Sequence, residues 1–318
     1  MRHTLAPALV MLGLLGAASI GNAWAGAPLA TFQAPGFFRM MVGDAEVTAL
    51  YDGVASIDAV KMLDEPAEDT KAALKSAFLR NPLATSDNAF LINTGAKLIL
   101  IDTGGGSFFG PGLGKLRANL RAAGYAPEQV DDILLTHLHR DHIGGLVADG
   151  QAAFPNAIVH ADKREADYWL SGANLENAPA DQKPRFQGAM AALAPYIASG
   201  RFQTFTADTE VVPMIRSVQA YGHSVGHTAY VVESKGQSLW LVGDLINVGA
   251  VQFGHPNISS GFDGDKAAAA ATRAHVLGEA AQSAVLVGAA HLPFPGLGHI
   301  SSAGTVWRWI PIDYSGTN

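Results

Sequence analysis

The chain has 318 residues, of which 48% are hydrophobic and 15% charged, and its formal net charge is −7. This length and apolar content are sufficient to bury a large core. No basic run or stripe occurs, so the composition argues against nucleic acid as a partner. The chain contains no cysteine. Disulfides, thiol nucleophiles and zinc–thiolate sites are therefore excluded, and any metal site must be built from histidine and carboxylate side chains.

The first residues have the features of a secretory signal peptide. A short positive start is followed by an apolar run over residues 5–20 and by a small-x-small pattern at residues 23–25. The run is broken by proline and glycine and is shorter than the roughly 20 apolar residues of a spanning helix. We therefore expect residues 1–25 to be removed. Residues 26–318 would remain as one domain without membrane attachment, in a periplasmic or secreted location.

Downstream of this segment, apolar runs separated by turn signals predict strands and helices in two sets. The first set comprises strands at 37–42, 46–51, 89–93 and 97–101 in an antiparallel meander, a helix at 115–123, strands at 130–135 and 157–160, and helices at 163–170 and 186–198. The second comprises a hairpin of 230–233 with 239–242, a helix at 265–281 and a strand at 284–287. Two sets of strands, each with its own helices, predict an α/β sandwich of two sheets covered by helices.

The strongest motif is Thr-His-Leu-His-Arg-Asp-His at residues 136–142, directly after a buried strand. Residues two apart on an extended segment point the same way, so His137 and His139 can converge on one ion. The chain then turns, and Asp141 and His142 face a neighbouring position. Neutral imidazoles and carboxylates suit zinc, and also iron or manganese. The motif therefore predicts a metal site.

This H-x-H-x-D-H pattern resembles the signature of the metallo-β-lactamase superfamily, and four further segments resemble that family's motifs in the same order. These are 98–104 with Asp102, 222–228 with His223 and His227, 241–244 with Asp244, and 289–292 with His291. The resemblance implies the αββα metallo-β-lactamase fold, in which two mixed sheets are flanked by helices. It also implies that Asp102 lies behind the metal ligands and that His227 supports the site without being a ligand.

The resemblance further implies two divalent ions, zinc in the first place, with iron or manganese as alternatives. His137, His139 and His223 would hold one ion, Asp141, His142 and His291 would hold the other, and Asp244 would bridge them. Asp244 and Asp141 would be the catalytic carboxylates. Two ions roughly 3.5–4 Å apart can lower the pKa of a shared water to about 7, so hydrolysis is the expected chemistry. Of the remaining histidines, His255 follows the Asp244 strand most closely.

Segments at 37–40, 109–111, 123–125, 167–170, 230–234 and 291–296 resemble one group of that family, the methyl parathion hydrolases and their lactone- and aryl-ester-hydrolysing relatives. The resemblance extends over nearly the whole mature chain. By that resemblance Phe109 and Trp169 line an apolar pocket above the metals, and Ile57, Met62, Asn247 and Phe262 lie nearby. Met62 stands where the organophosphate enzymes carry an arginine, and Asn247 and Phe262 stand where they carry leucines. These departures favour an aryl ester or aromatic lactone over an organophosphate triester.

Three other functions are compatible with parts of the sequence. An iron oxygenase of the same fold needs one iron, whereas seven ligands argue for two metals. A β-lactamase either uses a cysteine ligand or lacks the bridging aspartate. A non-catalytic metal-binding protein has no use for an apolar pocket above the ions. The expected partner is a small-molecule ester, lactone or phosphotriester, and a homodimer, common among relatives, remains open.

Overall fold

The structure is a computed structural model that describes residues 27, 29–31, 33–304 and 306–315. The predicted signal peptide, residues 1–25, lies outside these residues. The chain divides into two compact units, 1–34 and 35–318, and the following description concerns the second. Among the described residues, no helix is both long and apolar enough to cross a membrane.

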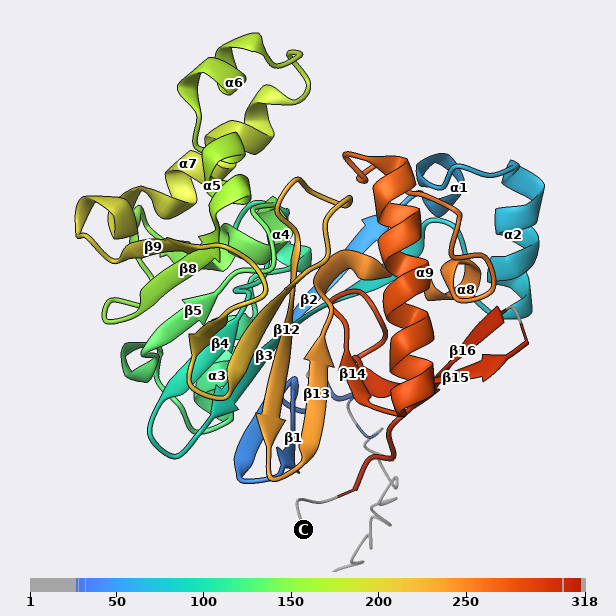
Figure 1. The fold of residues 1–318 in the computed structure, drawn as a ribbon, viewed down its shortest axis with the longest axis horizontal. Helices are drawn as coiled ribbons and strands as arrows, with labels where there is room; N and C mark the ends of the chain where they lie inside the picture. Colours follow the sequence, from blue (N-terminus) through green and yellow to red (C-terminus); the bar gives the residue numbers. More distant parts are fainter. Residues whose placement is uncertain (1–26, 28, 32, 305, 316–318) are drawn as a thin grey trace, which may run out of the picture. The chain divides into compact units, whose positions relative to one another are not determined.

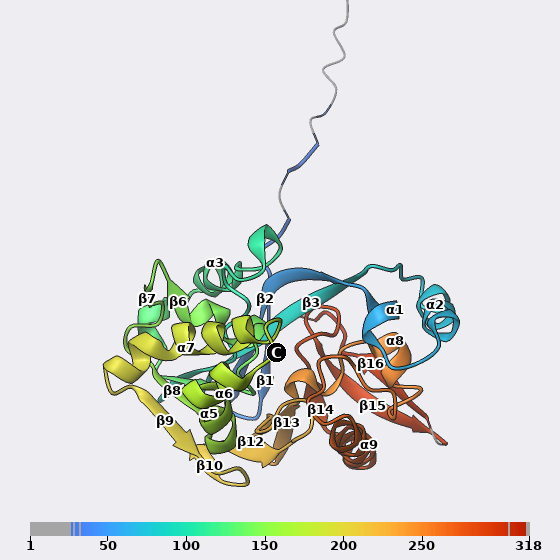
Figure 2. The ribbon, with the colours of Figure 1, turned by 90° about the horizontal axis from the view of Figure 1, so that it is seen from above.

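Two seven-stranded sheets are found in the described part of this unit (Figures 1 and 2). The first contains β1 (Phe37–Val42), β2 (Ala45–Ile57), β3 (Leu83–Asn93), β4 (Leu98–Ile101), β5 (Asp132–Leu134), β8 (Ile158–Asp162) and β9 (Phe202–Phe205), in this order. Its neighbours are antiparallel from β1 to β4 and parallel from β4 to β9. The predicted antiparallel meander is therefore confirmed.

The second sheet also follows chain order and is mixed. It contains β10 (Glu210–Val212), β11 (Ile215–Gln219), β12 (Thr228–Ser234), β13 (Gln237–Leu241), β14 (Leu286–Gly288), β15 (Leu297–Ala303) and β16 (Val306–Pro311). Only the β13–β14 pair is parallel among these described strands. A separate short hairpin pairs β6 (Val147–Ala148) with β7 (Gln151–Ala152).

Helices cover the outer side of each sheet. The first sheet is covered by α3 (Leu116–Ala122), α5 (Lys163–Trp169) and α7 (Lys183–Ala198), and the second by α9 (Lys266–Ser283), as Figure 2 shows. The shorter helices are α1 (Ala59–Met62), α2 (Ala67–Ser76), α4 (Arg140–Ile143), α6 (Gly172–Asn177) and α8 (Gly249–Gln252). This arrangement confirms the αββα sandwich of two mixed sheets flanked by helices.

Strand β4 shows how a short apolar run fills two core layers. Leu98 and Leu100 pack with the helices on the outer side of the first sheet, whereas Ile99 and Ile101 pack between the two sheets. This follows from the two-residue period of a strand. Burial of each such side chain contributes roughly 1.5–3 kcal/mol. A strand buried on both faces reads as a continuous apolar run, which is why it was predictable.

Several regular elements were not predicted, among them β11, β15 and β16. Two further differences arise where the backbone is irregular. Asp52-Gly53 resembles a turn but is a bulge, at which the register of β2 shifts and the strand continues to Ile57. Gly53 is required there, because its φ is +149° and a Cβ would lie 2.0 Å from the Gly112 carbonyl oxygen. The predicted strand at 284–287 begins later because Ala284 has φ 51° and ends α9 in the left-handed region.

Candidate metal centre

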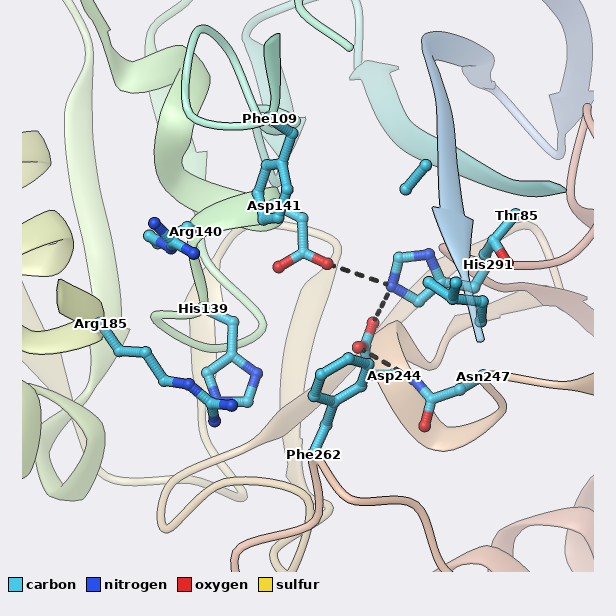
Figure 3. Close-up of a pocket in the computed structure, with 12 residues that line it drawn as sticks. Thr85, Phe109, His139, Arg140, Asp141, Arg185, Asp244, Asn247, Phe262 and His291 are labelled. Atoms are coloured by element: carbon cyan, nitrogen blue, oxygen red, sulfur yellow. Dashed lines mark hydrogen bonds and ion pairs between the residues drawn. The ribbon is translucent and has the colours of Figure 1, made fainter. Parts of the chain in front are cut away.

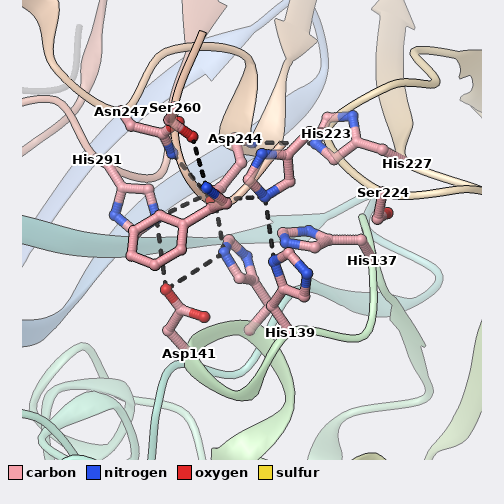
Figure 4. Close-up of polar contacts among 12 residues, drawn as sticks. His137, His139, Asp141, His223, Ser224, His227, Asp244, Asn247, Ser260 and His291 are labelled. Atoms are coloured by element: carbon pink, nitrogen blue, oxygen red, sulfur yellow. Dashed lines mark hydrogen bonds and ion pairs between the residues drawn. The ribbon is translucent and has the colours of Figure 1, made fainter. Parts of the chain in front are cut away.

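The seven predicted ligands come from segments that follow strands, with Asp141 and His142 in the short helix α4, and the fold brings all of them together. His137 and His139 follow β5, His223 follows β11, Asp244 follows β13 and His291 follows β14. They form two clusters, one of His137, His139 and His223 and the other of Asp141, His142, Asp244 and His291. Within each cluster the ligand atoms lie within 4.8 Å of one another. Figure 4 labels all of these ligands except His142 and shows the labelled ones pointing toward a common centre.

Asp244 lies between the two clusters. Its Oδ2 atom is 3.3 Å from Nε2 of His223, in the first cluster. Its Oδ1 atom is 2.9 Å from Nε2 of His142 and 3.0 Å from Nε2 of His291, in the second. Each oxygen thus faces a different set of imidazoles. Asp244 can therefore reach ions held in either cluster.

The donor atoms present fit divalent metal ions. Nε2 of His137 is buried and has no hydrogen-bond partner among the described residues. Nε2 of His142 and Oδ1 of Asp244 are also buried, and although they lie 2.9 Å apart they form no hydrogen bond of good geometry with any described residue. An unpaired buried polar atom costs about 1–3 kcal/mol, so such atoms rarely converge without a ligand. Coordination would satisfy all three. An all-nitrogen and oxygen set of this kind suits zinc, iron or manganese.

Hydrogen bonds to the outer ring nitrogens orient the histidine ligands. Nδ1 of His142 donates to Oδ2 of Asp102 at 2.8 Å, and Nδ1 of His223 donates to Oδ1 of Asp263 at 2.9 Å. Nδ1 of His291 donates to the carbonyl oxygen of Ser86 at 3.0 Å. Each bond places the ring proton on Nδ1 and leaves Nε2 free to bind a cation. The predicted position of Asp102 behind the ligands is confirmed.

Asp102 also links the ends of β4 and β5. Its carboxylate accepts hydrogen bonds from the backbone N–H and the hydroxyl of Thr136 at 2.8 and 2.7 Å. The Thr136 hydroxyl in turn lies 3.0 Å from Nδ1 of His137 and can accept its proton. The φ of Asp102 is 59°, in a region that aspartate tolerates better than most residues. This strained turn therefore places one carboxylate where it bonds both to His142, in the second cluster, and to Thr136, which precedes His137 of the first cluster.

His227 supports the site without being a ligand, as predicted. Its Nδ1 donates to the Ala220 carbonyl oxygen, and its Nε2 accepts the backbone N–H of Asp244 at 3.1 Å. Burial lowers the pKa of His227 to about 3, which keeps the ring neutral and able to accept. Gly243 permits this contact, because a Cβ there would lie 2.7 Å from Nε2 of His227. His255 is exposed and belongs to neither cluster.

The electrostatics of the two clusters differ. Burial lowers the pKa of His137 and of His139 well below the ordinary value, so both rings stay neutral. Burial also opposes the charging of His291, but Asp244 outweighs it and raises the pKa of His291 to about 10. For Asp244, His291 and His142 outweigh burial and hold the pKa of the carboxyl well below its usual range. The second cluster therefore attracts positive charge, which favours a metal cation.

Glu165 ties the two loops of the first cluster together and was not predicted. Its Oε1 accepts the backbone N–H of Leu138 and the indole N–H of Trp169, at 3.0 and 2.7 Å. Its Oε2 accepts the Ser224 hydroxyl and the Gly226 N–H, at 2.9 and 2.7 Å. Burial raises the pKa of this carboxyl. The sequence holds one indication of this role, because the charged Glu165 lies four residues before Trp169 and so on the same face of the helix.

Asp263 was also missed, because it lies in a loop without periodicity. It joins His223 to α9, since its Oδ2 is 3.3 Å from Nη2 of the buried Arg273. The guanidinium of Arg273 also donates to the carbonyl oxygens of Leu245, Pro256 and Ile258.

A cavity of about 140 Å³ opens over the second cluster (Figure 3). It is lined by Ala55, Ile57, Thr85, Phe109, His139, Arg140, Asp141, Arg185, Asp244, Asn247, Phe262 and His291. The predicted pocket residues Ile57, Phe109, Asn247 and Phe262 are therefore all on its wall. Asn247 has a second role, because its Nδ2 donates to Oδ2 of Asp244 at 3.1 Å.

The other two predicted pocket residues do not line this cavity. Trp169 lines a neighbouring one of about 360 Å³, which shares His139, Arg185 and Phe262 with the first. The indole ring meets His139 edge-on, with centroids 5.5 Å apart. Met62 packs against the small core between α1, α2 and α8. Its carbonyl oxygen accepts the Gly261 N–H, so it contacts the Phe262 loop through the backbone.

The αββα sandwich, with two clusters of possible metal ligands at its strand ends, is the architecture of a superfamily of hydrolases. The chain belongs to the metallo-β-lactamase superfamily, whose family model matches residues 84–302.

Two solved structures are similar to nearly the whole chain. One is the crystal structure of a hydrolase, AbOPH, in the β-lactamase superfamily. It is 36% identical, with a TM-score of 0.86, and the match covers 90% of this chain and all of that one. The other is AidC, a dizinc quorum-quenching lactonase in complex with a product. It is 29% identical, with a TM-score of 0.80, and the match covers 88% of this chain and 99% of that one.

A curated relative is similar over a shorter stretch. It is an atrochrysone carboxyl ACP thioesterase of Passalora fulva, 29% identical over 150 residues. The match covers 47% of this chain and 34% of the relative's length.

Proposed function

We propose that this protein is a binuclear metal-dependent hydrolase of ester bonds in small molecules, with aryl esters and lactones as its substrate class. The observation that carries the proposal is the position of Asp244, whose two oxygens face two separate sets of ligands. The similar structures include a dizinc lactonase, and the curated relative is a thioesterase. Both names describe cleavage of an acyl bond, which supports a carbonyl substrate here.

Divalent ions held in the two clusters would supply Lewis acidity and a water of lowered pKa. We propose zinc, because the donors are imidazole nitrogens and carboxylate oxygens. Asp244 fixes the spacing between the clusters, and Asn247 holds Oδ2 of Asp244 by a hydrogen bond. Asp141 lies on the cavity wall with its side chain 28% exposed. It is therefore the more accessible of the two carboxylates, and it would pass a proton from the attacking water to the departing alkoxide or phenoxide.

The cavity favours a planar group. Its volume of about 140 Å³ is close to that of an engineered protein cavity of roughly 150 Å³ that holds one benzene ring. Phe109 and Phe262 border it with 41% and 39% of their surface exposed. An aryl or lactone ring can lie between them with its carbonyl toward Asp141 and Asp244. A tetrahedral phosphotriester extends in every direction, so Phe262 would crowd one of its alkoxy groups.

We expect kcat/KM for an aryl ester or aromatic lactone to exceed that for methyl parathion by at least about tenfold, or roughly 1.4 kcal/mol of transition-state stabilisation. Phe262→Leu should narrow this ratio, because it widens the cavity. Steady-state kinetics with an aryl ester, an aromatic lactone and methyl parathion, together with metal analysis of the same purified sample, measure this ratio in the wild type and in the variant. Phe78→Leu is the matched control, because Phe78 is 96% exposed and lines neither cavity. A wild-type preference for the phosphotriester would contradict the proposed substrate class.

We also propose that the protein acts outside the cytoplasm after removal of residues 1–25. The support is the apolar run followed by the small-x-small pattern before Gly26. Intact-mass measurement of protein recovered from the periplasm should give a chain that begins near Gly26. Recovered protein that still carries Met1 would rule this out.

A further inference from the structure

Two arginines border the cavity, and neither has an acidic partner among the residues that the structure describes. Arg140 belongs to α4, between the ligands His139 and Asp141, and Arg185 belongs to α7. Figure 3 shows both guanidinium groups on the side of the cavity opposite His291 and Asn247. In the described part of the chain, no carboxylate forms an ion pair with either group. Both side chains are half-buried, so their charges are only partly hydrated.

Aromatic rings contact both guanidinium groups but do not neutralise them. Cζ of Arg140 lies 5.2 Å from the centre of the Phe109 ring, and Cζ of Arg185 lies 5.9 Å from that of Phe262. Such contacts orient a cation at modest gain and leave its charge available. Each arginine is therefore held at the cavity wall, and its guanidinium donates to no other side chain or carbonyl group in the described part of the chain.

Helix α7 determines the position of both arginines. Arg185 and Gly188 are three residues apart on α7 and so lie on the same face of the helix. The aliphatic part of Arg140 crosses Gly188, because a Cβ at that position would lie 2.9 Å from Cδ and 3.0 Å from Cγ of Arg140. The helix thus carries one guanidinium group and provides space for the other.

This concentration of positive charge is unfavourable without an anion. Two divalent ions would be balanced by the carboxylates of the site, which are Asp141 and Asp244 with Asp102 and Asp263 behind the ligands, whereas the two arginines add positive charge with no ion-pair partner among the described residues. Like charges repel strongly in a partly buried site, where the effective dielectric constant is low. Arginine binds carboxylates through two parallel hydrogen bonds from its planar guanidinium group. A carboxylate on the substrate would relieve the repulsion and satisfy the free donors.

We propose that the substrate carries a carboxylate, bound by Arg140 and Arg185, in addition to the ester carbonyl that lies near Asp141 and Asp244. This inference rests on the proposed ester hydrolysis and narrows its substrate class to carboxylate-bearing esters, lactones or thioesters. A compact carboxylate fits a cavity of about 140 Å³ together with little more than one ring. Arg185 and Phe262 also border the second cavity, so a longer substrate can extend there.

The test compares two esters that differ only in charge, mono-4-nitrophenyl glutarate and its methyl ester, on the zinc-loaded protein. We expect the wild-type kcat/KM for the acid to exceed that for the methyl ester by at least about tenfold. Arg140→Met and Arg185→Met should each lower this ratio at least about tenfold. Gly188→Ala should lower it in the same direction without removing a charge, because the added methyl group displaces Arg140.

Arg164→Met is the matched control. Arg164 also lies over an aromatic ring, with Cζ 4.5 Å from the centre of Tyr221, but it lines neither cavity. Its removal should leave the acid-to-ester ratio at the wild-type value. A wild-type preference for the methyl ester, or an equal ratio in the wild type and both cavity variants, would overturn the proposal.

Calorimetric titration with benzoate separates this proposal from the hydrolase function. We expect the Kd of benzoate to rise at least about tenfold in Arg140→Met and in Arg185→Met and to be unchanged in Arg164→Met. This result without turnover of any ester would contradict the hydrolase function and support the carboxylate site. If the wild type and the three variants turn over esters but bind benzoate with an identical Kd, the hydrolase function is supported and the carboxylate site is contradicted.

Discussion

Replacing Asp244 with alanine is expected to lower turnover of an aryl ester at least about 10³-fold and bound zinc from about two ions toward one. The reason is geometric, because each oxygen of Asp244 lies within 3.3 Å of a ligand nitrogen of a different cluster. An activity loss of this size corresponds to about 4 kcal/mol of transition-state stabilisation, as for other groups that organise a catalytic charge. Steady-state kinetics and metal analysis of the same sample measure both effects.

The control for this prediction is Asp167→Ala, which removes a carboxylate from the exposed face of α5. In the described part of the chain Asp167 pairs only with Lys163, and both side chains are at least 60% exposed. Activity and zinc content should remain at wild-type values in this variant. Circular dichroism should show that Asp244→Ala is folded. An Asp244→Ala protein with two zinc ions and undiminished turnover would remove Asp244 from the site.

The largest expected effect on stability comes from Arg273→Met. Arg273 is 1% exposed, pairs with Asp263 and donates to three backbone carbonyl groups. Methionine has a similar length but no donor, so Asp263 would be left as a buried charge with one partner fewer. Breaking a buried pair in this way costs about 3–5 kcal/mol. Urea unfolding of the two proteins measures the difference in free energy.

Zinc affinity should fall in the same variant, because Asp263 orients His223. Loss of such support weakens metal binding about 10–100-fold. Arg164→Met again serves as the control, since an exposed arginine should change the free energy of unfolding by no more than about 0.5 kcal/mol. A destabilisation of Arg273→Met below about 1 kcal/mol would show that the buried pair is not needed.

The ligands could be predicted from the sequence because most of their geometry is local. His137 and His139 alternate along an extended segment, and Asp141 and His142 occupy the helical turn that follows. Asp244 and His291 each end a run of apolar residues, and the resemblance to a family supplied their roles. The central strands were predictable for the same reason, since buried strands are continuous apolar runs.

The parts of the site that could not be predicted from the sequence depend on contacts between segments that are far apart in the chain. Asp263 and Arg185 reach the site from a loop and a helix that carry no metal-ligand pattern, so their roles depend on how α7 and α9 pack. Trp169 was expected above the metals but lines the neighbouring cavity. Its indole N–H donates to Glu165, which fixes the ring beside His139. No spacing in the sequence encodes that choice between two adjacent cavities.

The four hydrogen bonds of Glu165 have a consequence for the entropy of metal uptake. They fasten the Leu138 backbone, between two ligands, to Ser224 and Gly226, which follow His223. These loops therefore lose their conformational freedom when the chain folds, and not when an ion arrives. Fixing one residue's backbone costs about 1–2 kcal/mol. Because this cost is already met when the chain folds, metal binding to the first cluster does not have to supply it, and the affinity for the ion is higher for that reason.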